Sequence, residues 1–153
     1  MGTRLDYMKI SPDGVKALGG VYSYVKQCGL DETLVELIFL RTSEINGCAY
    51  CIDMHTRALL KMSVKADKVA LIPVWREARA LFSDREQAAL AWCESVTIVA
   101  QTHIPDPDFA AAAGVFSEKE LVDLTIVVGL MNLFNRMAIA FRKTPEAVLA
   151  VGK

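Results

Sequence analysis

Apolar residues recur along most of the chain at the three- and four-residue spacing of helices. Nowhere do they alternate with polar residues over a strand-length run, and no internal repeat is visible. The segment 32–45 is the clearest case, because its apolar residues cover a broad arc and predict a largely buried helix. The pattern therefore predicts an all-α fold.

Capping residues mark where these helices begin. Ser11 before Pro12 and Asp31 before Glu32 are typical helix starts, and Ser83 and Ser117 each precede a glutamate by three residues, as in a capping box. The predicted helices are 12–27, 32–45, 48–62, 84–101 and 118–142, with shorter ones near 63–71 and 108–113. Residues 1–12 are expected to be irregular, and the longest helix, 118–142, is expected to be central.

A tight turn at Asn46-Gly47 separates two of these helices, which should therefore pack as an antiparallel hairpin. At 1.5 Å per residue, Glu36 lies about 15 Å down the first helix and His55 about 12 Å down the second. The two side chains should lie at the same level and meet directly or through one water. A glutamate in so apolar a helix needs such a partner.

The chain has 153 residues, the size of one domain, and is 53% hydrophobic and 23% charged. The excess of apolar residues favours a subunit interface over a membrane, because the most span-like stretch, 121–140, contains Asp123 and Arg136. The first ten residues lack the apolar core of a signal peptide, so a cytoplasmic location is expected. The net charge of -1 without a basic run argues against a nucleic-acid partner.

The candidate chemistry lies at the start of the helix 48–62. If this segment is helical, Cys48, Cys51 and His55 fall within roughly a 60° arc of one face. Two thiols one turn apart can close a disulfide, and a histidine beside them can transfer a proton. The segment is interpreted as a redox-active dithiol with its own base, whereas Cys28 and Cys93 stand alone and are expected to be small buried side chains.

Two other hypotheses fit the same residues. One is a zinc site with four ligands, Glu36, Cys48, Cys51 and His55. Three of these ligands lie three and four residues apart on one rigid helix, so the fourth would have to be well placed from the neighbouring helix. Alternatively, the cysteines are buried structural residues of a protein without redox chemistry.

The spacing Glu36-x11-Cys48-x2-Cys51-x3-His55 is similar to the motif of alkylhydroperoxidase D-like proteins, in the carboxymuconolactone decarboxylase superfamily. The flanks Arg41–Gly47 and Asp53-Met54 also resemble that family, as does the late stretch from Asn132 to Arg142. The resemblance covers about residues 12–145, which would be the core of a single domain spanning 1–153.

The resemblance implies an alkylhydroperoxidase D-like helical bundle, assembly as trimers or hexamers, and thiol-dependent peroxidase or disulfide reductase activity without a metal or other cofactor. It assigns peroxide attack to Cys51, resolution to Cys48 and proton relay to Glu36 and His55. Hydroperoxide would be the substrate, and a small dithiol, a lipoyl-type dithiol or a thioredoxin-like protein the reductant. From the residues alone, helix position favours Cys48 as the attacking thiol.

Tyr50 stands where some members of the family have a second histidine, and a phenol is a poor base at neutral pH. Tyr50 is therefore expected to line the pocket only, and Asn132 is a second candidate pocket residue. A lyase activity like that of the decarboxylase branch is a further alternative, against which the presence of both cysteines argues.

Overall fold

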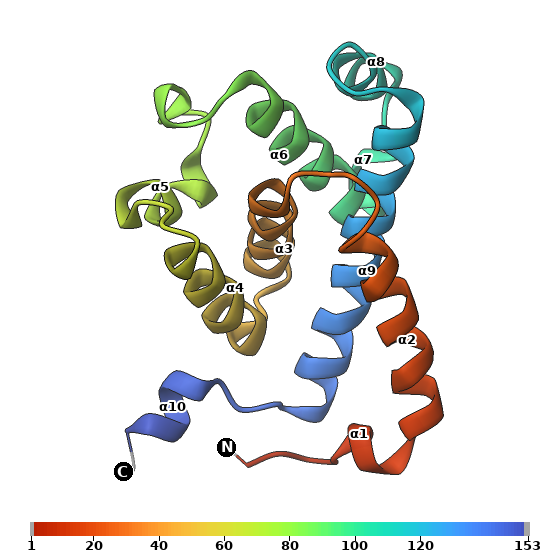
Figure 1. The fold of residues 1–153 in the computed structure, drawn as a ribbon, viewed down its shortest axis with the longest axis vertical. Helices are drawn as coiled ribbons and strands as arrows, with labels where there is room; N and C mark the ends of the chain where they lie inside the picture. The colour runs from red at the N-terminus through yellow and green to blue at the C-terminus, as the bar shows by residue number, and fades with distance from the viewer. Residues whose placement is uncertain (1, 152–153) are drawn as a thin grey trace.

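The computed structural model describes residues 2–151, and within this range the chain forms helices and no strand (Figure 1). The predicted all-α fold is confirmed. Its α-helices are α1 (Tyr7–Ile10), α2 (Pro12–Val25), α3 (Glu32–Asn46), α4 (Ala49–Lys61), α5 (Ala66–Ala70), α6 (Asp84–Thr97), α7 (Val99–Thr102), α8 (Asp106–Ala113), α9 (Glu118–Phe141) and α10 (Glu146–Ala150), with 3₁₀ turns η1 (Ile72–Val74) and η2 (Arg79–Leu81).

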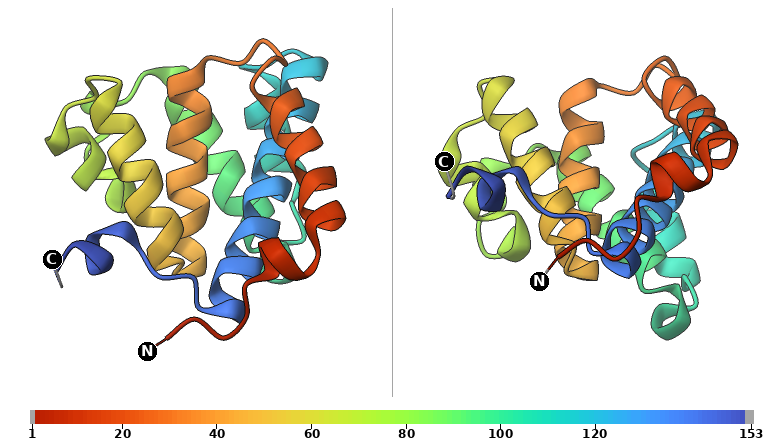
Figure 2. Two further views of the ribbon diagram at one scale, coloured as in Figure 1. Left: turned by 60° about the horizontal axis from the view of Figure 1, so that its bottom comes forward. Right: turned by 90° about the horizontal axis from the view of Figure 1, so that it is seen from below.

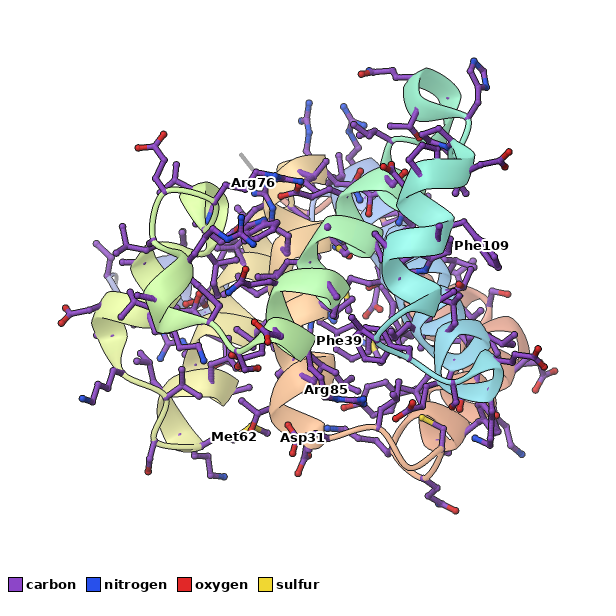
Figure 3. The ribbon with its side chains drawn as sticks, turned by 90° about the horizontal axis from the view of Figure 1, so that it is seen from above. Asp31, Phe39, Met62, Arg76, Arg85 and Phe109 are labelled. Carbon is purple, nitrogen blue, oxygen red and sulfur yellow. The ribbon has the colours of Figure 1, made fainter. Side chains whose placement is uncertain are left out.

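The helix α3 takes the central place that the sequence analysis gave to 118–142. It packs against α4, α6 and α9 and buries residues around its whole circumference, among them Leu37, Ile38 and Phe39. Figure 3 shows Phe39 in the interior, whereas Phe109 on α8 lies at the edge. Although α9 is the longest helix, it leaves part of its apolar surface exposed, for example at Val122. An apolar arc wider than one stripe therefore did not make that helix central.

Within residues 2–151, one helix, α9, is long and apolar enough to cross a membrane by length and composition alone. It also packs against α2, α3 and α6, and its residues Leu124, Val127 and Val128 are fully buried. A core helix passes the same test of length and composition.

The predicted hairpin of α3 and α4 is present, and the two helices lie side by side (Figure 2). Asp31 caps the start of α3, accepting a hydrogen bond from the Leu34 amide at 2.9 Å. Gly47 ends α3 in the left-handed conformation, with φ of 69°, which residues with a Cβ adopt at a cost. Cys48 follows at once as the N-cap of α4. This two-residue connection determines the register of the two helices.

Two local predictions were wrong. The expected irregular start contains α1, whose N-cap Asp6 accepts a hydrogen bond from the Lys9 amide. The predicted helix 84–101 is broken at Ile98, where ψ of 36° leaves the helical range and α7 begins separately. A short helix, α10, follows Pro145, beyond the predicted core.

Both ends of the described chain fold back onto the end of the bundle where α4 begins (Figures 1 and 2). The Arg4 amide donates to the carbonyl of Phe141 at 2.9 Å, which fixes the N-terminal segment to the end of α9. The Ala147 amide donates to the Asp53 carboxylate at 3.0 Å, which fixes α10 to α4. These segments surround the N-terminal end of α4 and thus the two cysteines.

Candidate functional site: a dithiol beside a buried Glu-His pair

Cys48 and Cys51 lie in direct contact at the start of α4. Their Sγ atoms are 2.7 Å apart, and both residues are buried, at 1% and 2% exposure. The Cys48 sulfur also accepts a hydrogen bond from the Cys51 amide at 3.4 Å, so Cys48 caps the helix as serine commonly does. The two sulfurs are therefore close enough for a disulfide to form between them.

The two thiols differ strongly in acidity. The hydrogen bond with Cys51 outweighs burial and, with the Cys51 amide and Asn135, lowers the pKa of Cys48 to about 7. The interaction with the Cys48 sulfur, together with burial, raises the pKa of Cys51 far above its ordinary range. The pair therefore holds one proton near neutral pH, with the negative charge on Cys48 at the helix N-terminus.

Glu36 and His55 meet as the hairpin register predicts. Glu36 Oε2 and His55 Nδ1 are 2.7 Å apart, and the residues are 4% and 3% exposed. Burial alone would raise the pKa of Glu36, but the hydrogen bonds from His55 and from Lys26, whose Nζ lies 3.3 Å from Oε1, hold it below its usual value. Glu36 is therefore an ionised partner that fixes the orientation of the imidazole ring.

The second ring nitrogen of His55 has no partner. Among residues 2–151, Nε2 of His55 is the buried side-chain nitrogen or oxygen that lacks a hydrogen bond. Buried polar atoms without partners are rare in native proteins, and each one requires an explanation. His55 also lines a cavity, and a small shift of its ring would bring this buried atom to a molecule bound there.

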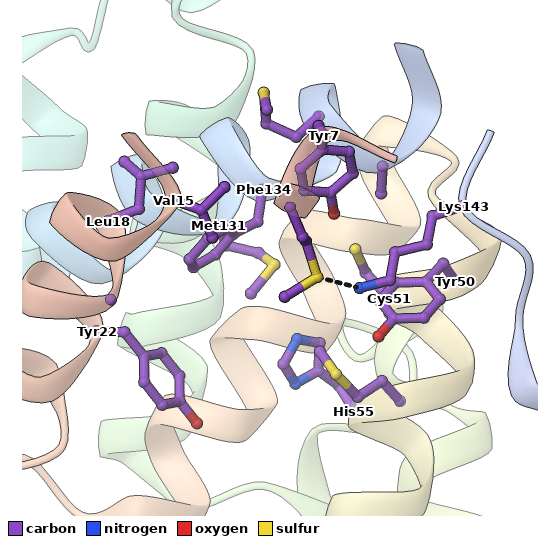
Figure 4. Close-up of a pocket in the computed structure, with 15 residues that line it drawn as sticks. Tyr7, Val15, Leu18, Tyr22, Tyr50, Cys51, His55, Met131, Phe134 and Lys143 are labelled. Carbon is purple, nitrogen blue, oxygen red and sulfur yellow. Dashed lines mark hydrogen bonds between the residues drawn. The ribbon is translucent and has the colours of Figure 1, made fainter. Parts of the chain in front are cut away.

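That cavity has a volume of about 300 Å³ and opens beside Cys51 (Figure 4). Cys51 and His55 line it, whereas Cys48 does not. Its remaining walls come from α1, α2, α4, α9 and the residue Lys143 after α9. They are formed by Tyr7, Met8, Val15, Leu18, Gly19, Tyr22, Tyr50, Met54, Met131, Phe134, Met137, Ala138 and Lys143.

Of the two predicted pocket residues, Tyr50 lines this cavity and Asn132 does not. Asn132 Oδ1 accepts a hydrogen bond from the Asn46 amide group at 3.0 Å, and the same group donates to Asn135 Oδ1 at 2.9 Å. Asn135 is fully buried and donates to Ser43 Oγ at 3.0 Å. This amide network joins the C-terminal end of α3 to α9 directly behind the cysteines.

Several residues of the site were not singled out in the sequence. Lys26, just after α2, reaches Glu36, and Lys143 reaches the ring of Tyr50 at 4.2 Å from the centroid. Tyr7 and Met8 come from the segment expected to be irregular. A lysine within reach of a buried glutamate is invisible in a single sequence because the contact depends on how α2 packs.

The zinc hypothesis receives no support from the geometry. In the described range, no group of three or more His, Cys, Asp or Glu side chains converges where it could hold a metal ion. The Nδ1 atom of His55 is occupied by Glu36, and the sulfurs contact each other.

Comparison with known proteins decides the family. The model of the carboxymuconolactone decarboxylase family matches residues 12–95, more than half of the chain. The chain belongs to this family. An uncharacterized family relative, YdfG of Bacillus subtilis, is 34% identical over 140 residues, which are 92% of this chain and 95% of YdfG. Alkyl hydroperoxide reductase AhpD of Koribacter versatilis is 38% identical over 47 residues, 31% of this chain and 24% of AhpD.

Solved structures confirm the alkylhydroperoxidase D-like form of the fold. A protein of unknown function from Agrobacterium tumefaciens, suggested to be an antioxidant defence protein AhpD, is 38% identical with a TM-score of 0.91 over 94% of this chain and 98% of that one. The debrominase Bmp8 shares the fold, with a TM-score of 0.82 at 22% identity over 92% of this chain and 75% of its own. The family is thus established, and the reaction has to be argued from the site.

Proposed function

We propose that the protein is a thiol-dependent peroxidase that reduces organic hydroperoxides through a dithiol/disulfide cycle of Cys48 and Cys51. The observation that carries this proposal is the arrangement at the cavity wall. Cys51, in contact with Cys48, lines the same apolar cavity as His55, whose buried Nε2 has no hydrogen-bond partner in the described chain. A nucleophilic sulfur, a second thiol and a proton-transfer group thus meet where an organic molecule can enter.

The chemistry begins with attack of Cys51 sulfur on the terminal peroxide oxygen, which breaks the O–O bond. Cys51 becomes a sulfenic acid, and the substrate leaves as an alkoxide that takes a proton through His55 to become an alcohol. The Cys48 thiol then attacks the sulfenic sulfur, which forms the disulfide and releases water. A dithiol reductant restores both thiols and is itself oxidised to a disulfide.

Acidity and exposure favour different cysteines for these roles. Cys51 faces the cavity but holds the proton, whereas Cys48 carries the charge and lies behind it. As Cys51 attacks, the Cys48 thiolate at 2.7 Å accepts its proton. Cys48 is then a thiol placed beside the new sulfenic acid. Helix position alone had favoured Cys48 as the attacking residue, and exposure to the cavity favours Cys51.

The remaining assignments belong to the same proposal. The protein would work in the cytoplasm as a homo-oligomeric trimer or hexamer, with a lipoyl-type or thioredoxin-like dithiol as electron donor. Exposed apolar side chains on α9, including Val122 and Ile139, support a subunit interface. Under this proposal the site needs no metal or other cofactor.

The experiment is a thiol titration of the reduced protein, with zinc content, before and after one equivalent of cumene hydroperoxide. We expect the four free thiols per chain to fall to two, with a Cys48-Cys51 disulfide identified by mass spectrometry. Thiols that do not react with peroxide but exchange with lipoamide would make the protein a disulfide reductase. Stoichiometric zinc, or no thiol reaction at all, would contradict the redox proposal and favour a metal site or a lyase.

A further inference from the structure

The cavity beside Cys51 combines apolar walls with an unpaired cation. Four of the six methionines, Met8, Met54, Met131 and Met137, line it together with aromatic side chains. Methionine adapts its shape to an apolar ligand, and a volume of about 300 Å³ is that of a small organic molecule. None of the fifteen lining residues is an aspartate or a glutamate.

Lys143 is the lysine of this cavity. It is half-buried, and its Nζ lies 4.2 Å from the centre of the Tyr50 ring and 5.8 Å from that of Tyr7. Figure 4 shows it pointing into the cavity, with Met8 sulfur at 3.9 Å as its hydrogen-bond partner. Burial would lower the pKa of Lys143, but the two tyrosines reverse this and raise it, so the group is a cation at neutral pH.

Other buried or half-buried lysines of the described chain have carboxylate partners. Lys26 pairs with Glu32 and Glu36, and Lys68 pairs with Glu86 at 2.6 Å. No carboxylate of residues 2–151 comes within salt-bridge distance of Lys143. Partial burial of a cation without an anion is costly, and an anionic ligand would remove that cost.

We infer that the cavity binds small organic acids, with the carboxylate at Lys143 and the apolar body among the methionines and Phe134. A second, independent observation is that His55, a residue of the same cavity wall, has a buried Nε2 without a hydrogen-bond partner in the described chain. If the protein is a peroxidase, as proposed above, its preferred substrates would be hydroperoxides of medium-chain fatty acids. This part of the inference rests on the proposed function. The binding site for the acid itself does not depend on peroxide chemistry.

The test compares the binding of octanoate and octan-1-ol to the reduced protein by isothermal titration calorimetry. These probes have the same chain length and do not react with thiols. We expect octanoate to bind at least about tenfold more tightly, because a hydrogen bond between two charged groups is stronger than one to a neutral hydroxyl. Lys143→Met should abolish this preference, and Lys143→Arg should retain most of it.

The matched control is Lys61→Met, which removes an exposed lysine at the end of α4 and should leave the preference unchanged. Equal binding of the two probes, no binding of octanoate, or an undiminished preference in Lys143→Met would overturn the inference. Lys143→Arg keeps the positive charge and tests the inference even if Lys143→Met does not fold. Loss of the preference for octanoate in Lys143→Arg would contradict an ion pair with the ligand.

A kinetic experiment separates this inference from the proposed function. The wild type should show a KM about tenfold lower for a hydroperoxy fatty acid than for its methyl ester, and Lys143→Met should equalise the two. Selective octanoate binding without peroxide turnover would refute the proposed function alone. Equal loss of turnover for acid and ester in Lys143→Met, without a change in their KM ratio, would show that Lys143 serves the thiolate and not the ligand.

Discussion

Two clusters of charged side chains, around Glu36 and around Glu94, differ in whether all their hydrogen-bonding atoms have partners. In the first, Glu36 pairs with His55 and Lys26, and Nε2 of His55 is left without a partner. In the second, Glu94 of α6 accepts hydrogen bonds from Arg41 at 2.8 Å and Trp75 at 3.0 Å and also from Arg76.

Both carboxylates are largely removed from solvent, and both link separate elements of the fold. The Glu94 cluster satisfies its acceptor atoms inside the protein, as a structural ion pair must. The Glu36 cluster leaves the buried Nε2 of His55 unsatisfied, and His55 lines a cavity together with the Cys51 thiol. Burial and charge therefore do not identify the site, whereas an incomplete set of hydrogen bonds does.

The largest expected effect comes from replacing a cysteine inside the site and comparing it with one outside the site. Cys51→Ser should reduce peroxide turnover by more than about 10³-fold, because a hydroxyl is a far weaker nucleophile than a thiol. Cys93→Ser is the matched control: Cys93 is fully buried beside Thr42, and burial raises its pKa to about 11. Turnover of cumene hydroperoxide should stay within about twofold of the wild type in this control. Full activity in Cys51→Ser would remove it from the mechanism.

The next experiment exchanges charge for an amide in each cluster. Glu36→Gln should reduce turnover about 10–100-fold, because His55 loses its anionic partner, while the shape of the pair is kept. Glu94→Gln should do the opposite: turnover stays unchanged and the free energy of unfolding falls by about 1–3 kcal/mol, since the arginines lose their counter-charge. Urea denaturation and peroxide assays on both variants check this. A common loss of both quantities in the two variants would mean that the clusters are not functionally distinct.

The smallest expected effect concerns pH. Burial raises the pKa of Glu44 to about 7, although Arg41 opposes this effect. Below that pH the protonated carboxyl group is the favoured form in the folded state. Its stabilising contribution is complete below about pH 4.5 and is lost as the pH rises to about 7, a change of about 1–3 kcal/mol. The contribution of Glu36 to stability depends on pH in the opposite direction. Its lowered pKa gives stability above about pH 4.5 that is lost in stronger acid.

Glu44→Gln should therefore flatten the stability profile between pH 4.5 and 7 and leave the acid limb intact. Thermal unfolding at half-unit pH steps measures both parts. A profile that still falls from pH 4.5 to 7 in Glu44→Gln would assign the slope to another group.

The parts of the site that could be predicted from the sequence are those fixed by local geometry. The turn at Asn46-Gly47 and the helical repeat determine that Cys51 and His55 share a face and that Glu36 lies level with His55, whereas Cys48 is the N-cap before the helix. Lys26 and Lys143 could not be found in this way, because their contacts depend on how α2 and the segment after α9 pack. The break at Ile98 has a weaker sequence signal: the four residues from Val96 to Val99 are all β-branched, which disfavours a helix, but no proline or glycine marks the end of α6.

The methionines around Cys51 also have a consequence for durability. Thioether sulfur is oxidised by the same class of molecule that the thiol is proposed to reduce, and Met131 lies in the wall of the same cavity as Cys51. Each hydroperoxide that escapes the thiol meets a second sulfur, whose sulfoxide is polar and alters the apolar wall. Under the proposed function, such a catalyst would lose activity with the number of turnovers, and methionine sulfoxide reductases would be needed to restore the wall.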